Sequence, residues 1–169
     1  MKTIGAILIF LSAAFWGISQ AKQIKDRNCF LKETISMLEI MKNEICTNRV
    51  TVKSILKSLE NNRFIYISCF IDGLKEAMDA LGEESMSEIW SECVNRYLRI
   101  LSPQAQYALN SLGHSIGRYD IQKQSTAFDR CIQGLSAEEA EDSRQLKSNE
   151  KMYIGLGSGA GAIAALLLI

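Results

Sequence analysis

The two ends of the chain contain no charged side chain, and this constrains the fold more than any other feature. Thr3–Ala21 and Met152–Ile169 lack Asp, Glu, Lys and Arg, whereas residues 22–151 hold every charge except Lys2. A helix of nineteen residues is about 28 Å long, close to the thickness of the hydrocarbon core of a bilayer. The sequence therefore predicts transmembrane helices at residues 1–21 and 152–169, on either side of one polar domain at residues 22–151.

Basic residues next to the two predicted spans indicate their orientation. They follow the first span and precede the second: Lys22, Lys25, Arg27, Lys32, Arg144, Lys147 and Lys151. Because basic flanks stay on the cytoplasmic side of a membrane, we expect a cytoplasmic central domain and two external termini.

The N-terminal segment has an alternative interpretation. Lys2, an apolar stretch and Ser19-Gln20-Ala21 are also typical of a secretory signal with a small-x-small cleavage site. In that case Lys22 begins an exported helical binding module with a C-terminal membrane anchor. The residue at the mature N-terminus distinguishes the two topologies.

The charge of the central domain argues against nucleic acid as a partner. Setting Lys2 aside from the 19 basic residues leaves 18 basic against 19 acidic residues, a net charge of −1. A protein that binds nucleic acid needs a basic face to neutralise phosphates. We expect no nucleic acid and no small-molecule substrate.

The five cysteines are odd in number and scattered, with no CxxC, and the chain has one histidine. Metal sites need clustered ligands, so the sequence predicts neither a metal nor a cofactor. Free thiols on apolar helix faces, in a reducing compartment, are the simpler interpretation.

Apolar residues recur at helical spacing throughout the central domain, which predicts an all-α antiparallel bundle of about six helices. The first helix continues from the membrane span to Ile45, and residues 47–51 break it. A short second helix over 52–59 and a third over 64–81 follow, the third ending at Gly82. A capping box at Ser85 and Glu88 opens the fourth helix. Ser102-Pro103 starts the fifth helix, and Asp120 caps a sixth that continues into the second span.

The segment Leu112-Gly113-His114-Ser115-Ile116-Gly117-Arg118-Tyr119-Asp120 is the most specific motif. Gly113 and Gly117 are four residues apart, so on a helix they would stack and let another backbone approach. Alternatively, Gly117 supplies a left-handed residue that closes the fifth helix, and Asp120 opens the sixth. We take Leu112, Gly113, Ile116, Gly117 and Asp120, together with Trp90 on the fourth helix, as candidate partner contacts.

Glycines dominate the start of the C-terminal apolar segment. Gly155/Gly159 and Gly157/Gly161 form overlapping GxxxG pairs, and Ala13/Gly17 in the first segment have the same spacing. Small residues let helices approach closely in lipid, which predicts that these glycines pack the two spans against each other within one chain.

The remaining polar residues show no catalytic pattern. His114 has no nucleophile and carboxylate that the sequence can place beside it, and the acidic run Glu138, Glu139, Glu141 and Asp142 is expected to form a solvated face of the sixth helix. A partner could dock on such a face, which the sequence alone does not decide. We predict that the protein is not an enzyme.

Several of these segments together resemble the stage III sporulation protein AB family. They are Glu44-Ile45, Ile89-Trp90, the Leu112-Gly113-x-x-Ile116-Gly117-x-x-Asp120 element with Gln124 beyond it, and Lys151-Met152-Tyr153-x-x-Leu156-Gly157. The chain departs from that family at Val50-Thr51, where a proline is usual.

The resemblance implies a protein of the mother-cell membrane around the forespore, within the secretion-like channel complex that connects the two cells during spore formation. It implies a cytoplasmic bundle similar to the F domain of type II secretion systems. Such a domain is a platform that docks a separate cytoplasmic ATPase, and the family brings no catalytic residue.

Overall fold

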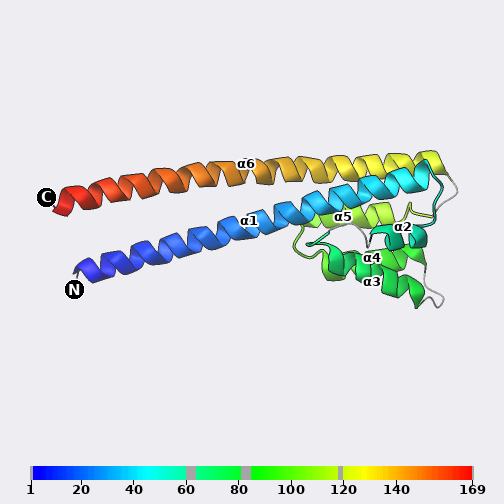
Figure 1. Ribbon diagram of the computed structural model, residues 1–169, viewed down its shortest axis with the longest axis horizontal. Helices are drawn as coiled ribbons and strands as arrows, with labels where there is room; N and C mark the ends of the chain where they lie inside the picture. The colour runs from blue at the N-terminus through cyan, green and yellow to red at the C-terminus, as the bar shows by residue number, and fades with distance from the viewer. Residues whose placement is uncertain (1, 60–63, 81–84, 118–119, 169) are drawn as a thin grey trace. The chain divides into compact units, whose positions relative to one another are not determined.

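The computed structural model describes the backbone of residues 2–59, 64–80, 85–117 and 120–168, and the side chains of the same ranges from residue 22 to residue 148. In chain order its helices are α1 (Lys2–Cys46), α2 (Val52–Leu59), α3 (Ser68–Asp79), α4 (Met86–Tyr97), α5 (Pro103–Gly113) and α6 (Ile121–Leu168) (Figure 1). The described residues contain no strand. The predicted all-α class with six helices is therefore confirmed.

The chain divides into two compact units. Residues Met1–Asn28 and Ala140–Ile169 form the first, which we call the terminal unit, and Cys29–Glu139 form the second, the bundle unit. In the terminal unit the first part of α1 and the last part of α6 are antiparallel partners, joined by side-chain contacts described below. In the bundle unit α2–α5 lie together on one side of the adjoining parts of α1 and α6 (Figure 1).

The two predicted membrane spans lie where the side chains are not described. Residues 2–21 and 152–168 are helical, as parts of α1 and α6. Among the residues described in full, no helix has a stretch that is both long and apolar enough to cross a bilayer. The spans at 1–21 and 152–169 fall outside those residues, so they remain predictions.

The bundle unit has one apolar core, to which all six helices contribute. Its largest fully buried side chains include Trp90, Phe70, Phe128, Leu31, Met37, Leu38, Met41, Ile55, Leu56, Leu59, Ile67 and Leu74. Two ion pairs link α1 to α6 at the edge of this core. Lys42 Nζ lies 2.6 Å from Asp129 Oδ1, and Lys32 Nζ lies 3.5 Å from Glu139 Oε1.

The predicted break between the first two helices is confirmed. Glu44 accepts a hydrogen bond from the Asn48 side chain at 3.0 Å, and its carbonyl accepts the Val50 N–H at 2.9 Å. Arg49 sits between them in the left-handed region, at φ 55°. Thr51 Oγ1 then accepts the Ser54 N–H at 3.4 Å, which places a threonine cap at the start of α2.

The third helix is shorter than its sequence predicts. Its pattern suggested residues 64–81, but α3 begins at Ser68 and ends at Asp79; Gly82, the expected terminator, lies outside the described residues. The Glu33 side chain of α1 explains the late start. Its carboxylate accepts the N–H groups of Ile65, Tyr66 and Ile67 at 2.7–3.1 Å, which holds these residues in an irregular turn.

The predicted starts of the next two helices are confirmed. Ser85 and Glu88 form a reciprocal capping box on α4, and the bond from the Ser85 N–H lowers the pKa of the Glu88 carboxyl. Ser102 caps α5 by accepting the Ala105 N–H at 3.1 Å, with Pro103 in the first turn. Both signals are local in sequence, which is why they could be recognised without the structure.

Candidate functional site

Trp90, the aromatic candidate, is fully buried in the bundle unit. Its Nε1 donates to the Leu109 carbonyl oxygen of α5 at 2.8 Å, and its ring meets Phe70 edge-on at 5.5 Å between centroids. Gly113 lies against the same ring: a Cβ there would be 2.4 Å from Trp90 Cδ1. Trp90 and Gly113 thus form one packing contact between α4 and α5.

The rest of the motif turns the chain from α5 into α6. Leu112 and Ile116 are 2% and 5% exposed, so their side chains belong to the core. Gly117 has φ +82°, a left-handed conformation that side chains with a Cβ rarely adopt. Of the two structural alternatives for the glycine pair, stacking on one helix is therefore wrong, because Gly117 follows the end of α5 in a turn.

Asp120 caps the long helix α6. Its Oδ1 accepts the Lys123 N–H at 3.1 Å, and its Oδ2 lies 3.3 Å from Lys123 Nζ. The backbone bond from Lys123 holds the pKa of the Asp120 carboxyl below its usual value. The negative charge of Asp120 also lies beside the N-terminus of α6, where the helix dipole is positive, and this attraction stabilises the helix.

The structure thus divides the six candidate residues into two groups. Leu112, Gly113, Ile116 and Trp90 are buried, and Gly117 and Asp120 are exposed. Only the exposed turn could touch a partner directly. His114 is an exposed residue at the C-terminal end of α5.

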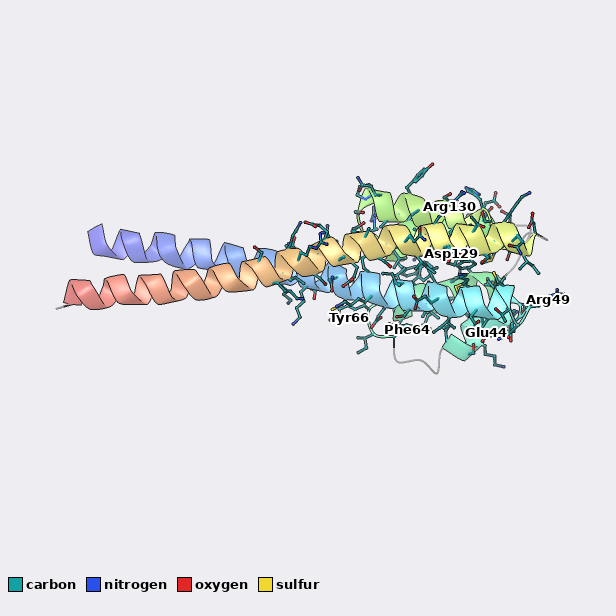
Figure 2. All side chains as sticks on the ribbon, turned by 90° about the horizontal axis from the view of Figure 1, so that it is seen from above. Glu44, Arg49, Phe64, Tyr66, Asp129 and Arg130 are labelled. Atoms are coloured by element: carbon teal, nitrogen blue, oxygen red, sulfur yellow. The ribbon has the colours of Figure 1, made fainter. Side chains whose placement is uncertain are left out.

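Two polar clefts flank the first turns of α6. One, of about 360 Å³, is lined by Ser115 from the turn and by Gln122, Lys123, Thr126, Ala127 and Arg130 of α6. The other, of about 530 Å³, lies against α1 and is lined by Glu39, Lys42, Asn43, Cys46, Thr47, Ser125, Asp129 and Ile132. Figure 2 shows Arg130 and Asp129 on opposite sides of α6, with Asp129 on the side of α1. A partner at this end of the bundle unit would find ion-pairing and hydrogen-bonding groups.

In the acidic run on α6 Glu141 is exposed, as the sequence pattern predicted, but the other three residues do not form a solvated face: Glu138, Glu139 and Asp142. Asp142 is 1% exposed and paired with Arg27 within the terminal unit. In the bundle unit, Glu138 Oε2 accepts the Ser102 hydroxyl at 2.6 Å, while Glu139 lies near Lys32. These carboxylates hold helices together, which the run of charges did not reveal because their partners are distant in sequence.

The cysteines are all free. Burial raises the pKa of the Cys93 thiol to about 11 and that of Cys131 to about 12, while Cys69 is exposed. Among the described residues, no three His, Cys, Asp or Glu side chains are grouped as metal ligands. The glycines proposed to pack the spans, Gly155, Gly157, Gly159 and Gly161, lie outside the residues whose side chains are described.

Sequence reasoning missed Glu33, Glu138 and Asp142 as structural residues. Each is a charged side chain on α1 or α6 whose partner lies more than thirty residues away. No local pattern marks such a pair.

Comparison with known proteins agrees with this architecture. The curated Stage III sporulation protein AB of Bacillus subtilis (strain 168) is 23% identical over 171 residues, covering 100% of this chain and 99% of that protein. A solved structure of Stage III sporulation protein AB shares the fold with a TM-score of 0.65 at 15% identity, covering 72% of this chain and 97% of the other. The sequence model of the family Stage III sporulation protein AB matches residues 2–169, so the chain belongs to this family.

Proposed function

We propose that the protein is a non-enzymatic membrane platform of the channel complex that links mother cell and forespore. In this proposal the apolar ends of α1 and α6 span the mother-cell membrane around the forespore, and the bundle unit lies in the cytoplasm and docks a separate ATPase. The observation that carries the proposal is the family match over residues 2–169, which includes both apolar ends.

Charge patterning supports the membrane part of the proposal. Each apolar segment is followed or preceded along the chain by basic residues. Among the described ones Arg27 is half-buried, and the others are exposed: Lys22, Lys25, Lys32, Arg144 and Lys147. Basic flanks of this kind keep a domain on the cytoplasmic side.

We place the ATPase contact at the start of α6. Gly117 and Asp120 are the exposed members of the motif at residues 112–120. The cleft beside them is lined by the exposed side chains of Lys123 and Arg130. Arg130 is the better probe, since Lys123 also closes the Asp120 cap. A basic residue at a partner surface contributes mainly through complementary charge, so reversing it produces repulsion.

The binding experiment uses the full-length chain in detergent and the purified cytoplasmic ATPase of the same sporulation complex. We expect Arg130→Glu to weaken binding at least about tenfold, because a reversed charge replaces attraction by repulsion. Lys57→Glu, an exposed charge reversal on α2, is the matched control and should retain native affinity. Equal affinity of both variants would contradict this contact surface, and no binding by the native chain would contradict ATPase docking itself.

Topology is tested by thiol labelling in intact cells. With Cys29 and Cys46 replaced by Ser, Cys69 is the exposed thiol, whereas Cys93 and Cys131 are buried. Because it is buried, Cys131 is unsuitable as a reporter of topology. We expect Cys69 to resist a membrane-impermeant reagent until the cells are opened. Labelling in intact cells, or a mature chain that begins at Lys22, would favour the exported module instead.

A further inference from the structure

Side chains at Arg27 and Asn28 join α1 to α6 within the terminal unit. Arg27 Nε donates to Asp142 Oδ2 at 2.7 Å, and Arg27 Nη2 donates to Asp142 Oδ1. Next to this pair, Asn28 Nδ2 donates to Ser143 Oγ at 3.1 Å. The partners are neighbours on each helix. The positions that they join sum to 169 and 171, so both contacts fit nearly the same antiparallel register.

These contacts are partly buried. Asp142 and Asn28 are 1% and 3% exposed, while the Arg27 side chain is 32% exposed. A buried ion pair adds little net stability, because removing both charges from water costs about as much as their attraction returns. Its distinctive effect is specificity, since any arrangement that separates the pair leaves a buried charge unpaired.

The geometry of the pair makes it sensitive to sliding. A guanidinium that faces a carboxylate through two parallel bonds is directional as well as charged. Moving α6 along α1 by one helical turn displaces Asp142 by about 5.4 Å, beyond the reach of both bonds. The other described ion pair in this unit, Arg144 with Glu141 at 3.9 Å, lies within α6 and is exposed, so it does not restrain sliding.

We propose that the Arg27–Asp142 and Asn28–Ser143 contacts fix the register of α1 against α6, and so make the second apolar end of the same chain the partner of the first. Ala13 lies fourteen residues before Arg27. Leu156 lies fourteen residues after Asp142, between Gly155 and Gly157. Antiparallel helices in this register bring Ala13 to the level of Gly155 and Gly157. The inference concerns pairing alone and does not depend on docking of an ATPase.

Disulfide cross-linking of the full-length chain in detergent tests the register. Cys29, Cys46 and Cys69 are replaced by Ser, and the buried Cys93 and Cys131 are kept. Ile24→Cys with Leu146→Cys forms an in-register reporter at two half-buried positions of the terminal unit, and Ile24→Cys with Glu150→Cys tests a shift of one turn. The in-register pair should give a cross-linked monomer at a yield at least about tenfold above the shifted pair, because a shift unpairs a buried charge.

The decisive variant carries Arg27→Met with Asp142→Leu, which replaces the ion pair by apolar side chains. We expect it to melt near the native temperature but to lose the preference, with the two reporter pairs within about threefold of each other. Arg27→Lys keeps the charge but loses the bidentate hydrogen bonding. It should give an intermediate preference for the in-register cross-link, even if the double variant folds poorly. An unchanged preference in both variants, or cross-links mainly at the size of a dimer, would overturn the proposal.

Discussion

Replacing Gly113 by Ala should destabilise the bundle unit, although alanine is normally favoured over glycine in a helix. The added Cβ would lie 2.4 Å from Trp90 Cδ1 and 2.9 Å from Cγ, far inside contact distance. Trp90 cannot easily withdraw, because its Nε1 is bonded to the Leu109 carbonyl and its ring is packed against Phe70. The methyl group must therefore shift α5 or break these contacts.

The magnitude follows from two costs and one smaller gain. Overpacking of a core costs about 1–3 kcal/mol, and losing the satisfied indole N–H costs about 1–3 kcal/mol more. The gain in helix propensity is at most about 1 kcal/mol and is smaller at the last residue of a helix. We expect a net loss of about 2–4 kcal/mol, or roughly 6–12 °C in melting temperature at about 3 °C per kcal/mol.

Thermal and urea unfolding of the detergent-solubilised chain, followed by circular dichroism, measure this loss. Gly134→Ala is the matched control: Gly134 lies within α6, a Cβ there meets nothing within 4 Å, and we expect a gain of about 0.5–1 kcal/mol. Combining Gly113→Ala with Trp90→Phe should recover at least about 1 kcal/mol relative to additive effects, since the two side chains are in contact. Equal stability of Gly113→Ala and the native chain, or strict additivity with Trp90→Phe, would refute this account of Gly113.

Four further substitutions follow from particular contacts. Glu33→Ala removes the acceptor of three backbone N–H groups and should cost about 1–2 kcal/mol in urea unfolding, with Glu33→Gln losing less. Glu138→Ala frees the Ser102 hydroxyl and should cost about 1 kcal/mol, whereas a solvated-face glutamate would cost nothing measurable. Arg49→Gly relieves a left-handed residue and should raise the free energy of unfolding by up to about 1 kcal/mol in urea unfolding. Gly117→Val should lower the melting temperature through its φ of +82°, and an unchanged melting curve together with unchanged ATPase binding would contradict a role for this turn.

The sequence predicted helix starts well wherever the cap is local. Ser85, Ser102 and Asp120 each bond a backbone N–H three residues ahead, so the signal and the helix occupy the same stretch of chain. The start of α3 was misplaced because its restraint comes from Glu33, 32 residues before Ile65. An apolar pattern could not show that Phe64–Ile67 would form a turn held from another helix.

The candidate site was predicted less well than the fold, for a related reason. Periodicity identifies Trp90, Leu112 and Ile116 as apolar positions but does not separate a core contact from an exposed one. Gly113 illustrates the difficulty: its spacing to Gly117 suggested one helix face, while its role is to accommodate the Trp90 ring. That role depends on how α4 crosses α5, which the sequence of α5 alone does not contain.

These packing roles change how loss of function in the family motif should be interpreted. A Gly113 variant that no longer binds the ATPase would fail because the fold is weakened, since Gly113 is buried against Trp90 and cannot touch a partner. An Arg130 variant would not lose binding through a weakened fold, because Arg130 is exposed in the cleft beside the turn. Binding measured well below the melting temperature of each variant therefore separates the two cases. Gly113→Ala should regain affinity on cooling as its folded fraction recovers, whereas Arg130→Glu should stay weak at every temperature at which it is folded.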